Sequence, residues 1–385
     1  MNRPRIVHLT SAHPWDETRV FHKMCRWLAR AGAEVHLVAA HGPEPPGEMV
    51  DGVRVHLLSQ PSGRRERMTR TRAAVWRKAL ALEPDLVHFH DPELLWGRPW
   101  RARPEVRVVY DAHEDLREQV TLKRWLPLPK CLLRWAVGRM EERLSTSAHG
   151  LITVDPAIVR RFPGREVPLV RNFPDIEFLD AIEPAERPAG SKDKWVAICA
   201  GTLGTDRGTG SLVRVFEYVP EHLELWLIGD VPPAELADWQ TWPGWRRVRY
   251  YPRMDHRSVV ALEKVADAVL HVLPPHAQYQ WARYPVKGLE AMACGVPLVM
   301  SDFECFRKTF SGAAEFVDPE NPREMAAVLE RLAADEARMA VMRDQARHLA
   351  QEKFSWAEEF RTLTEEYARL APARDLLEVM KYETC

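Results

Sequence analysis

Strand-like and helix-like segments alternate along this chain from its beginning to its end. Short, mostly apolar runs are separated by longer stretches whose apolar residues repeat with the period of an amphipathic helix. Because a helix that connects two such runs builds a βαβ unit, the alternation predicts parallel sheets. The expected strands are 5–10, 34–40, 53–58, 85–90, 107–111 and 151–154 in a first set, and 195–201, 223–229, 248–251, 268–273, 297–301 and 315–317 in a second.

A polar, proline-containing stretch at 183–194 separates the two sets of strands. A chain of 385 residues also has the length of two ordinary domains, each able to bury its own core. We therefore expect an α/β protein with two Rossmann-like, doubly wound domains that face one another across a cleft. The first domain is expected to span 1–175 and the second 190–353.

The stretch from Arg283 to Val299 predicts a loop, an amphipathic helix that stops at Gly295, and a buried strand. Lys287 lies at the start of the helix, where free backbone N–H groups and a cation together favour an anion such as a diphosphate. Glu290 follows about one turn later, and its carboxylate can accept hydrogen bonds from sugar hydroxyls. The pair predicts a pocket for a nucleoside diphosphate, most simply that of a nucleotide sugar.

A glycine-containing turn follows the first strand of the second set and reads Gly201-Thr-Leu-Gly204-Thr-Asp-Arg207-Gly208. In doubly wound folds this turn borders the ligand crevice. Arg207 and Lys287 follow different strands, so both can converge on one diphosphate. The alternative for Arg207 is a solvated side chain on a plain glycine turn.

These two segments and three others resemble, in the same order along the chain, the motifs of the family-4 glycosyltransferases, which have the GT-B fold. The closest resemblance is to members that assemble polysaccharides and glycoconjugates. The other three segments are 8–23 (HLTSAHPWDETRVFHK), 110–114 (YDAHE) and 171–174 (RNFP).

The resemblance implies transfer of a sugar from a nucleoside diphosphate sugar with retention of configuration. UDP is the commonest nucleotide in the family. The acceptor would be a glycan, a lipid-linked glycan or a small molecule bound by the first domain. The leaving phosphate would deprotonate the acceptor. A terminal helix within 354–385 would cross back onto the first domain. No cofactor is expected, and no metal, because two cations and a helix start neutralise the diphosphate and no D-x-D pair ends a strand.

The resemblance also implies a role for each residue of a catalytic set. Lys287 and Arg207 would hold the phosphates, and Glu290 would bind the ribose hydroxyls. His113 would contact the donor sugar and steady its oxocarbenium-like transition state. Further donor contacts are expected from Gly204, Thr205, Gly208, Tyr284, Pro285, Val286 and Gly288.

Two positions depart from the family pattern. Thr202 stands where many members have an arginine, and Ala282 stands where many have a first carboxylate, eight residues before Glu290. Backbone N–H groups around 284–288 are the expected substitute for that carboxylate. The alternative role for Glu290 is a charge near a helix N-terminus, which stabilises by about 0.3–1 kcal/mol.

Histidines at strand ends of the first domain have two interpretations each. His113 could act on the donor, or it could pair with Asp111 or Glu114 for structural reasons. His88 and His90 share a face of their strand, which suits a metal, but no further ligands follow at set spacings, and polar packing near the crevice is the preferred interpretation.

The loop after the first strand carries three polar residues that we expect to bind the acceptor, His13, Asp16 and Arg19. An equal alternative for Asp16 is to cap the following helix.

Net charge, cysteine pattern and hydropathy bear on the expected partners and cellular location. The formal net charge of -1 gives no reason to expect a nucleic-acid partner. The six cysteines form no C-x-x-C pair, so reduced thiols in the cytoplasm are expected. We see no signal peptide and no apolar run of about 20 residues. A basic stretch at 64–78 and a mixed apolar and basic stretch at 123–143 could rest on the inner face of a membrane, although a solvated helix face is the commoner explanation of such stretches.

Two other functions fit the same architecture. A nucleotide-sugar 2-epimerase would convert the donor without any acceptor. A non-catalytic scaffold would bind the donor without turnover, and the losses at Thr202 and Ala282 keep that alternative open.

Overall fold

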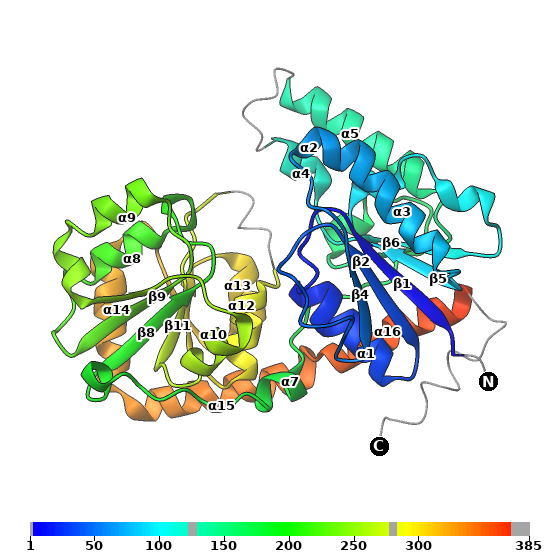
Figure 1. The fold of residues 1–385 in the computed structure, drawn as a ribbon. Coiled ribbons are helices and arrows are strands. Elements are labelled where there is room, and N and C mark those ends of the chain that lie inside the picture. Colours follow the sequence, from blue (N-terminus) through cyan, green and yellow to red (C-terminus); the bar gives the residue numbers. More distant parts are fainter. Residues whose placement is uncertain (1–2, 122–128, 277–282, 371–385) are drawn as a thin grey trace. The chain divides into compact units, whose positions relative to one another are not determined.

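The computed structural model describes residues 3–121, 129–276 and 283–370 (Figure 1). These residues form two compact units. The N-terminal unit contains the chain up to Asn172 together with the segment from Trp356 onward, and the C-terminal unit is Phe173–Ser355. Each unit contains one sheet with helices on both faces, so the predicted α/β class is confirmed.

The N-terminal unit has a seven-stranded sheet with the order β3-β4-β2-β1-β5-β6-β7. All neighbouring strands are parallel except β3 and β4, which are antiparallel. Every predicted strand of this set is present, with ends that shift by a residue or two. The two-residue β3 was not predicted, because it is too short to show any periodicity. The strands are β1 (Arg5–Thr10), β2 (Glu34–Ala39), β3 (Met49–Val50), β4 (Val53–Leu57), β5 (Leu86–Phe89), β6 (Arg107–Ala112) and β7 (Gly150–Thr153).

Helices cover both faces of this sheet and bury its apolar side chains. The last described helix, α16 (Trp356–Leu370), adds Trp356, Leu363 and Tyr367 to the core on one face. The other helical segments are η1 (Thr18–Cys25, π-helical), α1 (Arg26–Arg30), α2 (Arg64–Glu66), η2 (Arg67–Thr71), α3 (Arg72–Ala81), η3 (Pro92–Leu95), η4 (Pro99–Ala102), α4 (Leu116–Thr121), α5 (Lys130–Ser145) and α6 (Pro156–Val159).

The C-terminal unit has a six-stranded sheet with the order β10-β9-β8-β11-β12-β13, and all its strand pairs are parallel. Parallel strands are covered on both faces and read as nearly continuous apolar runs. All six residues of β9 are buried accordingly. The strands are β8 (Trp195–Ala200), β9 (Leu223–Ile228), β10 (Val248–Tyr251), β11 (Ala268–His271), β12 (Leu298–Ser301) and β13 (Ala314–Val317).

Four helices of this unit, α7, α10, α14 and α15, begin at a residue whose side chain caps them. The side chains of Asp175, Asp255, Asn321 and Asp335 each accept a hydrogen bond from a first-turn N–H group. The helical segments are α7 (Ile176–Asp180), η5 (Ala189–Ser191), η6 (Thr205–Arg207), α8 (Thr209–Val215), α9 (Pro233–Trp239), η7 (Pro243–Arg247), α10 (His256–Glu263), α12 (Val286–Ala293), α13 (Glu304–Phe310), α14 (Pro322–Ala334) and α15 (Glu336–Lys353).

Each sheet has one point at which its strand order reverses. In the N-terminal unit the chain moves outward from β1 to β2 and later returns to β5 on the other side of β1. In the C-terminal unit the same reversal occurs between β8 and β11. Ligands of open α/β sheets bind outside the carboxyl ends of the strands at such switch points, so these two places are where a site is expected.

Candidate active site

The turn after β8 lies at the switch point of the C-terminal unit. A backbone hydrogen bond to β9 holds Gly201 in place, because its N–H donates to Ile228 O at 2.7 Å. A Cβ on Gly229 would lie 1.8 Å from Gly201 O, so the two backbones touch only because this residue is glycine. Gly208 has a φ of 76°, and a Cβ there would lie 2.6 Å from Val272 O, just past β11. The turn is thus packed between the ends of β9 and β11.

Lys287 lies directly against this turn. It belongs to the first turn of α12, and its Nζ donates a hydrogen bond to Ala200 O at the end of β8. A Cβ on Gly201 would lie 1.7 Å from Nζ, so a side chain there would displace the ammonium group. In the described part of the chain, no carboxylate lies within salt-bridge distance of Lys287, and the helix start at Pro285 has no side-chain cap.

His271, at the end of β11, lies within the electrostatic influence of both Arg207 and Lys287. Burial, followed by the positive charges of Lys287 and Arg207, lowers the pKa of His271 to about 3. Its Nε2 is buried and has no hydrogen-bond partner among the described residues. The Arg207 side chain itself is 43% exposed, with its Nε 4.0 Å from Asp206. Arg207 belongs to the turn after β8 and Lys287 bonds the carbonyl just before that turn, so both predicted phosphate ligands lie at the switch point.

Glu290 lies in the second turn of α12 and is buried. His256, at the start of α10, places its Nε2 3.2 Å from a Glu290 carboxylate oxygen. Glu263 lies at the other end of α10 and is also buried. Burial, followed by the negative charge of Glu290, raises the pKa of Glu263 to about 8. The site thus contains the Glu290 carboxylate, which pairs with His256. Beside it lies Glu263, whose raised pKa keeps it protonated at neutral pH.

The other predicted donor-binding residues already contact neighbouring protein groups. The backbone N–H and the hydroxyl of Thr205 both donate to Glu235, at 2.6 and 2.8 Å, and the N–H of Gly204 donates to Thr209 Oγ1 at 3.1 Å. The Tyr284 ring packs against Phe173 and Phe354.

The remaining positions lie at the start of α12. Pro285 is its N-cap residue and Val286 its first residue. Gly288 is buried, and a Cβ on it would lie 3.2 Å from the Phe310 ring, so packing already accounts for this glycine. Ala282 lies outside the described residues.

At the switch point of the N-terminal unit, Asp111 is the centre of a buried polar group. Arg19 donates to its carboxylate from Nε at 2.8 Å and from Nη2 at 2.9 Å. His90 Nδ1 lies 3.0 Å from Oδ2, and His113 Nδ1 lies 3.5 Å from it. Burial opposes ionisation of Asp111, but Arg19 and His113 hold its pKa well below the usual range. Burial alone would lower the pKa of His113, but Asp111 overcomes this and raises it.

Arg19 therefore differs from its predicted place in an acceptor-facing loop. It is 2% exposed, and Asp111 engages its guanidinium group inside the unit. The sequence could not show this pair, because the two residues lie 92 positions apart. Asp16 is exposed, and its predicted alternative as a helix cap is wrong. Glu17 supplies the cap, with its carboxylate 2.8 Å from Val20 N.

The loop that contains His13 is fixed by Asp91, which follows β5. One Asp91 oxygen accepts from Ser11 N at 2.5 Å, from Thr10 Oγ1 at 3.0 Å and from Ala12 N at 3.2 Å. The other oxygen lies 3.4 Å from His13 Nε2. The predicted acceptor residue His13 is thereby held at the carboxyl end of β1.

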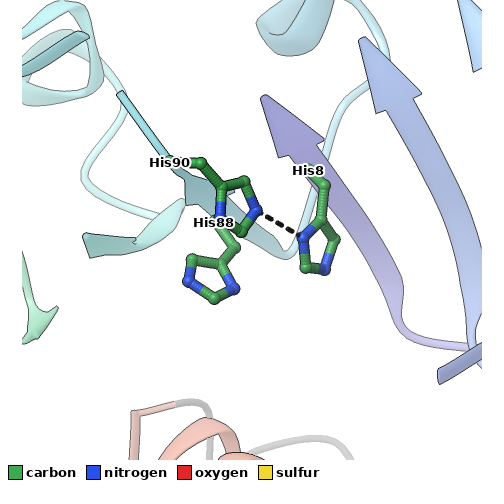
Figure 2. A group of neighbouring side chains, drawn as sticks. All are labelled: His8, His88 and His90. Atoms are coloured by element: carbon green, nitrogen blue, oxygen red, sulfur yellow. Dashed lines mark hydrogen bonds between the residues drawn. The ribbon is translucent and has the colours of Figure 1, made fainter. Parts of the chain in front are cut away.

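His8, His88 and His90 lie together on the same face of this sheet (Figure 2). His8 Nδ1 is 3.0 Å from His90 Nε2, and the Tyr367 hydroxyl is 2.6 Å from His88 Nδ1. Burial is the main reason that the pKa of each of the three is lowered. The preferred prediction for His88 and His90 was polar packing, and the structure adds His8, which the sequence did not suggest.

Three residues of the C-terminal site were not predicted either. His256 and Glu263 stand at the two ends of α10 and His271 ends β11, and no spacing links them to Lys287 or Glu290 in the sequence. An acid on the apolar face of a predicted helix, as at Glu263, is the one signal that could have been noticed.

The surface of α5 carries exposed apolar side chains, with Leu132 50% and Trp135 64% exposed. Across the residues that the structure describes, no helix has both the length and the apolar character needed to cross a bilayer.

Comparisons with known proteins agree with this architecture. A family model for a glycosyl transferase 4-like domain matches residues 17–172, and one for a glycosyl transferase-like domain matches residues 211–365. No curated protein matches the chain.

Several solved structures share its fold over nearly their whole length. Sucrose-phosphate synthase from Thermosynechococcus elongatus is 18% identical, with a TM-score of 0.71 over 97% of this chain and 100% of that chain. Anabaena HepE in complex with UDP and glucose is 18% identical, with a TM-score of 0.69 over 96% and 100%. WaaG, a glycosyltransferase involved in lipopolysaccharide biosynthesis, is 15% identical, with a TM-score of 0.67 over 96% and 100%. With both halves matched in order and the fold shared throughout, this chain is a glycosyltransferase and belongs to family 4 of the GT-B enzymes.

Proposed function

We infer that this glycosyltransferase uses a nucleoside diphosphate sugar, with a UDP-sugar as the first candidate, and transfers the sugar with retention of configuration. The observation that carries the proposal is the meeting of Lys287, Arg207 and the start of α12 at the switch point of the C-terminal unit. Two cations beside free helix N–H groups fit a diphosphate. The binding of UDP and UDP-glucose by the structurally similar HepE supports the choice of base.

Each charged group of the site has a place in the proposed reaction. Lys287 and Arg207 stabilise the negative charge that grows on the diphosphate as the sugar departs, so no metal ion is needed for this step. Glu290 accepts hydrogen bonds from the ribose hydroxyls, and its contact with His256 fixes the orientation of the carboxylate. The neutral imidazole of His271 adds a buried nitrogen that can bond a ligand next to both cations.

The N-terminal unit is the proposed acceptor side. The Nδ1 of His113 faces Asp111, which leaves Nε2 for the donor sugar. A diphosphate oxygen of the leaving group takes the proton of the acceptor hydroxyl, so the protein supplies no general base. Acceptor binding by His13 and Asp16, a glycan, lipid-linked or small-molecule acceptor, a cytoplasmic location and contact of α5 with a membrane stay predictions.

A ligand screen followed by an assay tests the proposal. UDP-, GDP- and ADP-sugars are added to the full-length protein, and a donor that binds the native state raises Tm. Lys287→Ala should abolish that rise. Lys308→Ala is the matched control, because this lysine is 73% exposed and pairs with Glu304 on the surface of α13.

Turnover is then measured with labelled donor, with and without acceptors, and with added Mg²⁺ or Mn²⁺. Transfer that needs an acceptor and does not respond to these ions supports the proposal. Conversion of the donor alone to its epimer would instead identify a 2-epimerase, and equal Tm shifts for both lysine variants would refute the diphosphate site.

A further inference from the structure

A chain of hydrogen bonds runs through the N-terminal unit from its core to His113. It begins with His8 on β1, whose Nδ1 lies 3.0 Å from Nε2 of His90, the residue after β5 (Figure 2). His90 Nδ1 lies 3.0 Å from Asp111 Oδ2 on β6. His113 Nδ1 lies 3.5 Å from the same carboxylate oxygen and 3.3 Å from the Asp111 backbone oxygen. The chain therefore joins three neighbouring strands to a predicted site residue.

The buried carboxylate sets the direction of these hydrogen bonds. Burial opposes ionisation of Asp111, but Arg19 and His113 hold its pKa well below the usual range, so the carboxylate only accepts. His90 Nδ1 therefore carries a proton. Burial lowers the pKa of His90 and keeps its ring neutral, so Nε2 accepts from His8 Nδ1. His113 Nδ1 faces two oxygen acceptors and carries a proton for the same reason, which directs Nε2 away from Asp111.

His113 is the most exposed member of this chain. His8 is 0% exposed and His90 and Asp111 are each 1% exposed, whereas the His113 side chain is 14% exposed. Well-packed apolar side chains often stabilise a core as well as a buried ion pair with polar neighbours does. The group lies at the switch point, where ligands of open α/β sheets bind. Its location therefore favours a role in orienting His113 over a role in packing alone.

We propose that His90 is a positioning residue of the sugar transfer, which holds Asp111 against His113 and thereby directs His113 Nε2 toward the donor sugar. His8 supports His90 from β1 in the same way. The inference rests on the proposed contact of His113 with the donor sugar.

The contacts of Asp111 explain why one hydrogen bond matters. Arg19 donates to both carboxylate oxygens, and Oδ2 is the oxygen that Arg19, His90 and His113 share. Without the N–H of His90, this oxygen loses one of its donors, and the position of His113 becomes less well defined. Displacement of a catalytic group by about 1 Å costs up to roughly 100-fold in rate, whereas substrate binding depends on other contacts.

Two substitutions of His90 separate positioning from packing. His90→Asn keeps an N–H near the place of Nδ1, whereas His90→Leu removes the donor to Asp111. We expect kcat of the full-length enzyme to fall by about 10–100-fold in His90→Leu with the donor KM nearly unchanged, and most of it to return in His90→Asn. His56→Leu is the matched control and should keep normal kcat, because it removes one histidine from another bonded pair of the same sheet, His36–His56 at 2.9 Å.

Kinetics in a His113→Ala background show whether His90 acts through His113. There His90→Leu should lower kcat by less than about twofold, because the group that it positions is gone. His8→Leu covers the case in which His90→Leu does not fold, and should lower kcat by about 3–10-fold only when His113 is present. An undiminished loss without His113, equal losses in His90→Asn and His90→Leu, or a loss in His56→Leu would overturn the proposal.

An NMR titration of His113 without substrates tests the coupling independently of the transfer. Burial and Arg19 lower the pKa of His113, whereas Asp111 and Glu114 raise it, and the His13 ring lies 5.3 Å away. With one donor fewer, Asp111 holds a proton on His113 more tightly, so we expect this pKa to rise in His90→Leu and not in His90→Asn. An unchanged pKa in His90→Leu would overturn the coupling. The expected rise in a protein that transfers no sugar would refute the proposed function instead.

Discussion

The two sheets reverse their strand order at equivalent places, but they use the charged side chains there in opposite ways. Between β1 and β5, Arg19 is 2% exposed and both of its hydrogen-bonding contacts go to the buried Asp111. Between β8 and β11, Arg207 is 43% exposed, and Lys287 bonds a backbone carbonyl rather than a carboxylate. In one unit the fold neutralises its own cation, and in the other it positions cations that an anionic ligand can neutralise.

The buried ion pair of the N-terminal unit should therefore matter for the stability of the fold, and the cations of the C-terminal unit for ligand binding. A desolvated ion pair that loses one partner leaves a buried charge, so its removal destabilises the folded protein. A cation at a helix start that bonds a backbone carbonyl, as Lys287 does, should instead affect ligand affinity when it is removed. Four measurements test this contrast.

Asp111→Ala should have the largest effect on folding. It leaves the Arg19 guanidinium buried without its carboxylate, and we expect the free energy of unfolding to fall by about 3–5 kcal/mol in a urea titration. Asp302→Asn is the matched control, since Asp302 also pairs with one arginine, Arg307, but is 42% exposed. That variant should lose no more than about 1 kcal/mol. Equal losses in the two variants would contradict the contrast.

Lys287→Ala should affect activity and leave stability nearly unchanged. Loss of one positive charge from the proposed diphosphate site should lower kcat/KM by about 100–1,000-fold, or about 3–4 kcal/mol in the transition state. The measurement is initial-rate kinetics against donor concentration, with the urea midpoint as the stability readout. A large loss of stability with normal kinetics would reverse the roles assigned to the two units.

Glu263 makes the donor side sensitive to pH. Its folded pKa of about 8 lies above the ordinary value of 4.5, so its contribution to stability is complete below pH 4.5 and is lost as pH rises toward 8. The loss is on the order of 3 kcal/mol, because burial and Glu290 both oppose its ionisation. Unfolding curves at several pH values should show this decline in the wild type and much less of it in Glu263→Gln. A decline of the same size in both proteins would mean that Glu263 is not its source.

The smallest effect distinguishes two neighbouring acids at the start of η1. Glu17→Ala removes the carboxylate that caps Val20 N, and should cost about 1 kcal/mol of unfolding free energy. Asp16→Ala removes an exposed side chain that does not cap this segment, and should cost almost nothing. A larger loss in Asp16→Ala would restore the capping role that the structure assigns to Glu17.

The fold could be predicted in detail because its signals are local. Most strands are buried apolar runs between helix-like stretches, and the predicted strand 223–229 matches β9, all six of whose residues are buried. The placement of Arg207 and Lys287 at the same sheet edge was also predictable, since the carboxyl ends of parallel strands meet there. Among the strands of the described residues, only β3 was not predicted, because two residues are too few to show a pattern.

What could not be predicted depends on pairs that are distant in sequence. Nothing local to Arg19 indicates a carboxylate at Asp111, and nothing local to His88 indicates a tyrosine 279 positions later. His271 was missed for the same reason, because its importance comes from two cations on other elements. A single sequence shows which residues could bind, whereas tertiary packing decides which are already occupied.

The return of the chain at Trp356 has a consequence for synthesis on the ribosome. The N-terminal unit completes its core with Trp356, Leu363 and Tyr367, which emerge from the ribosome only after all of Phe173–Ser355. The C-terminal unit is a single continuous segment and needs no later residues. The unit that is translated first therefore keeps part of one sheet face uncovered until Trp356–Leu370 has left the ribosome.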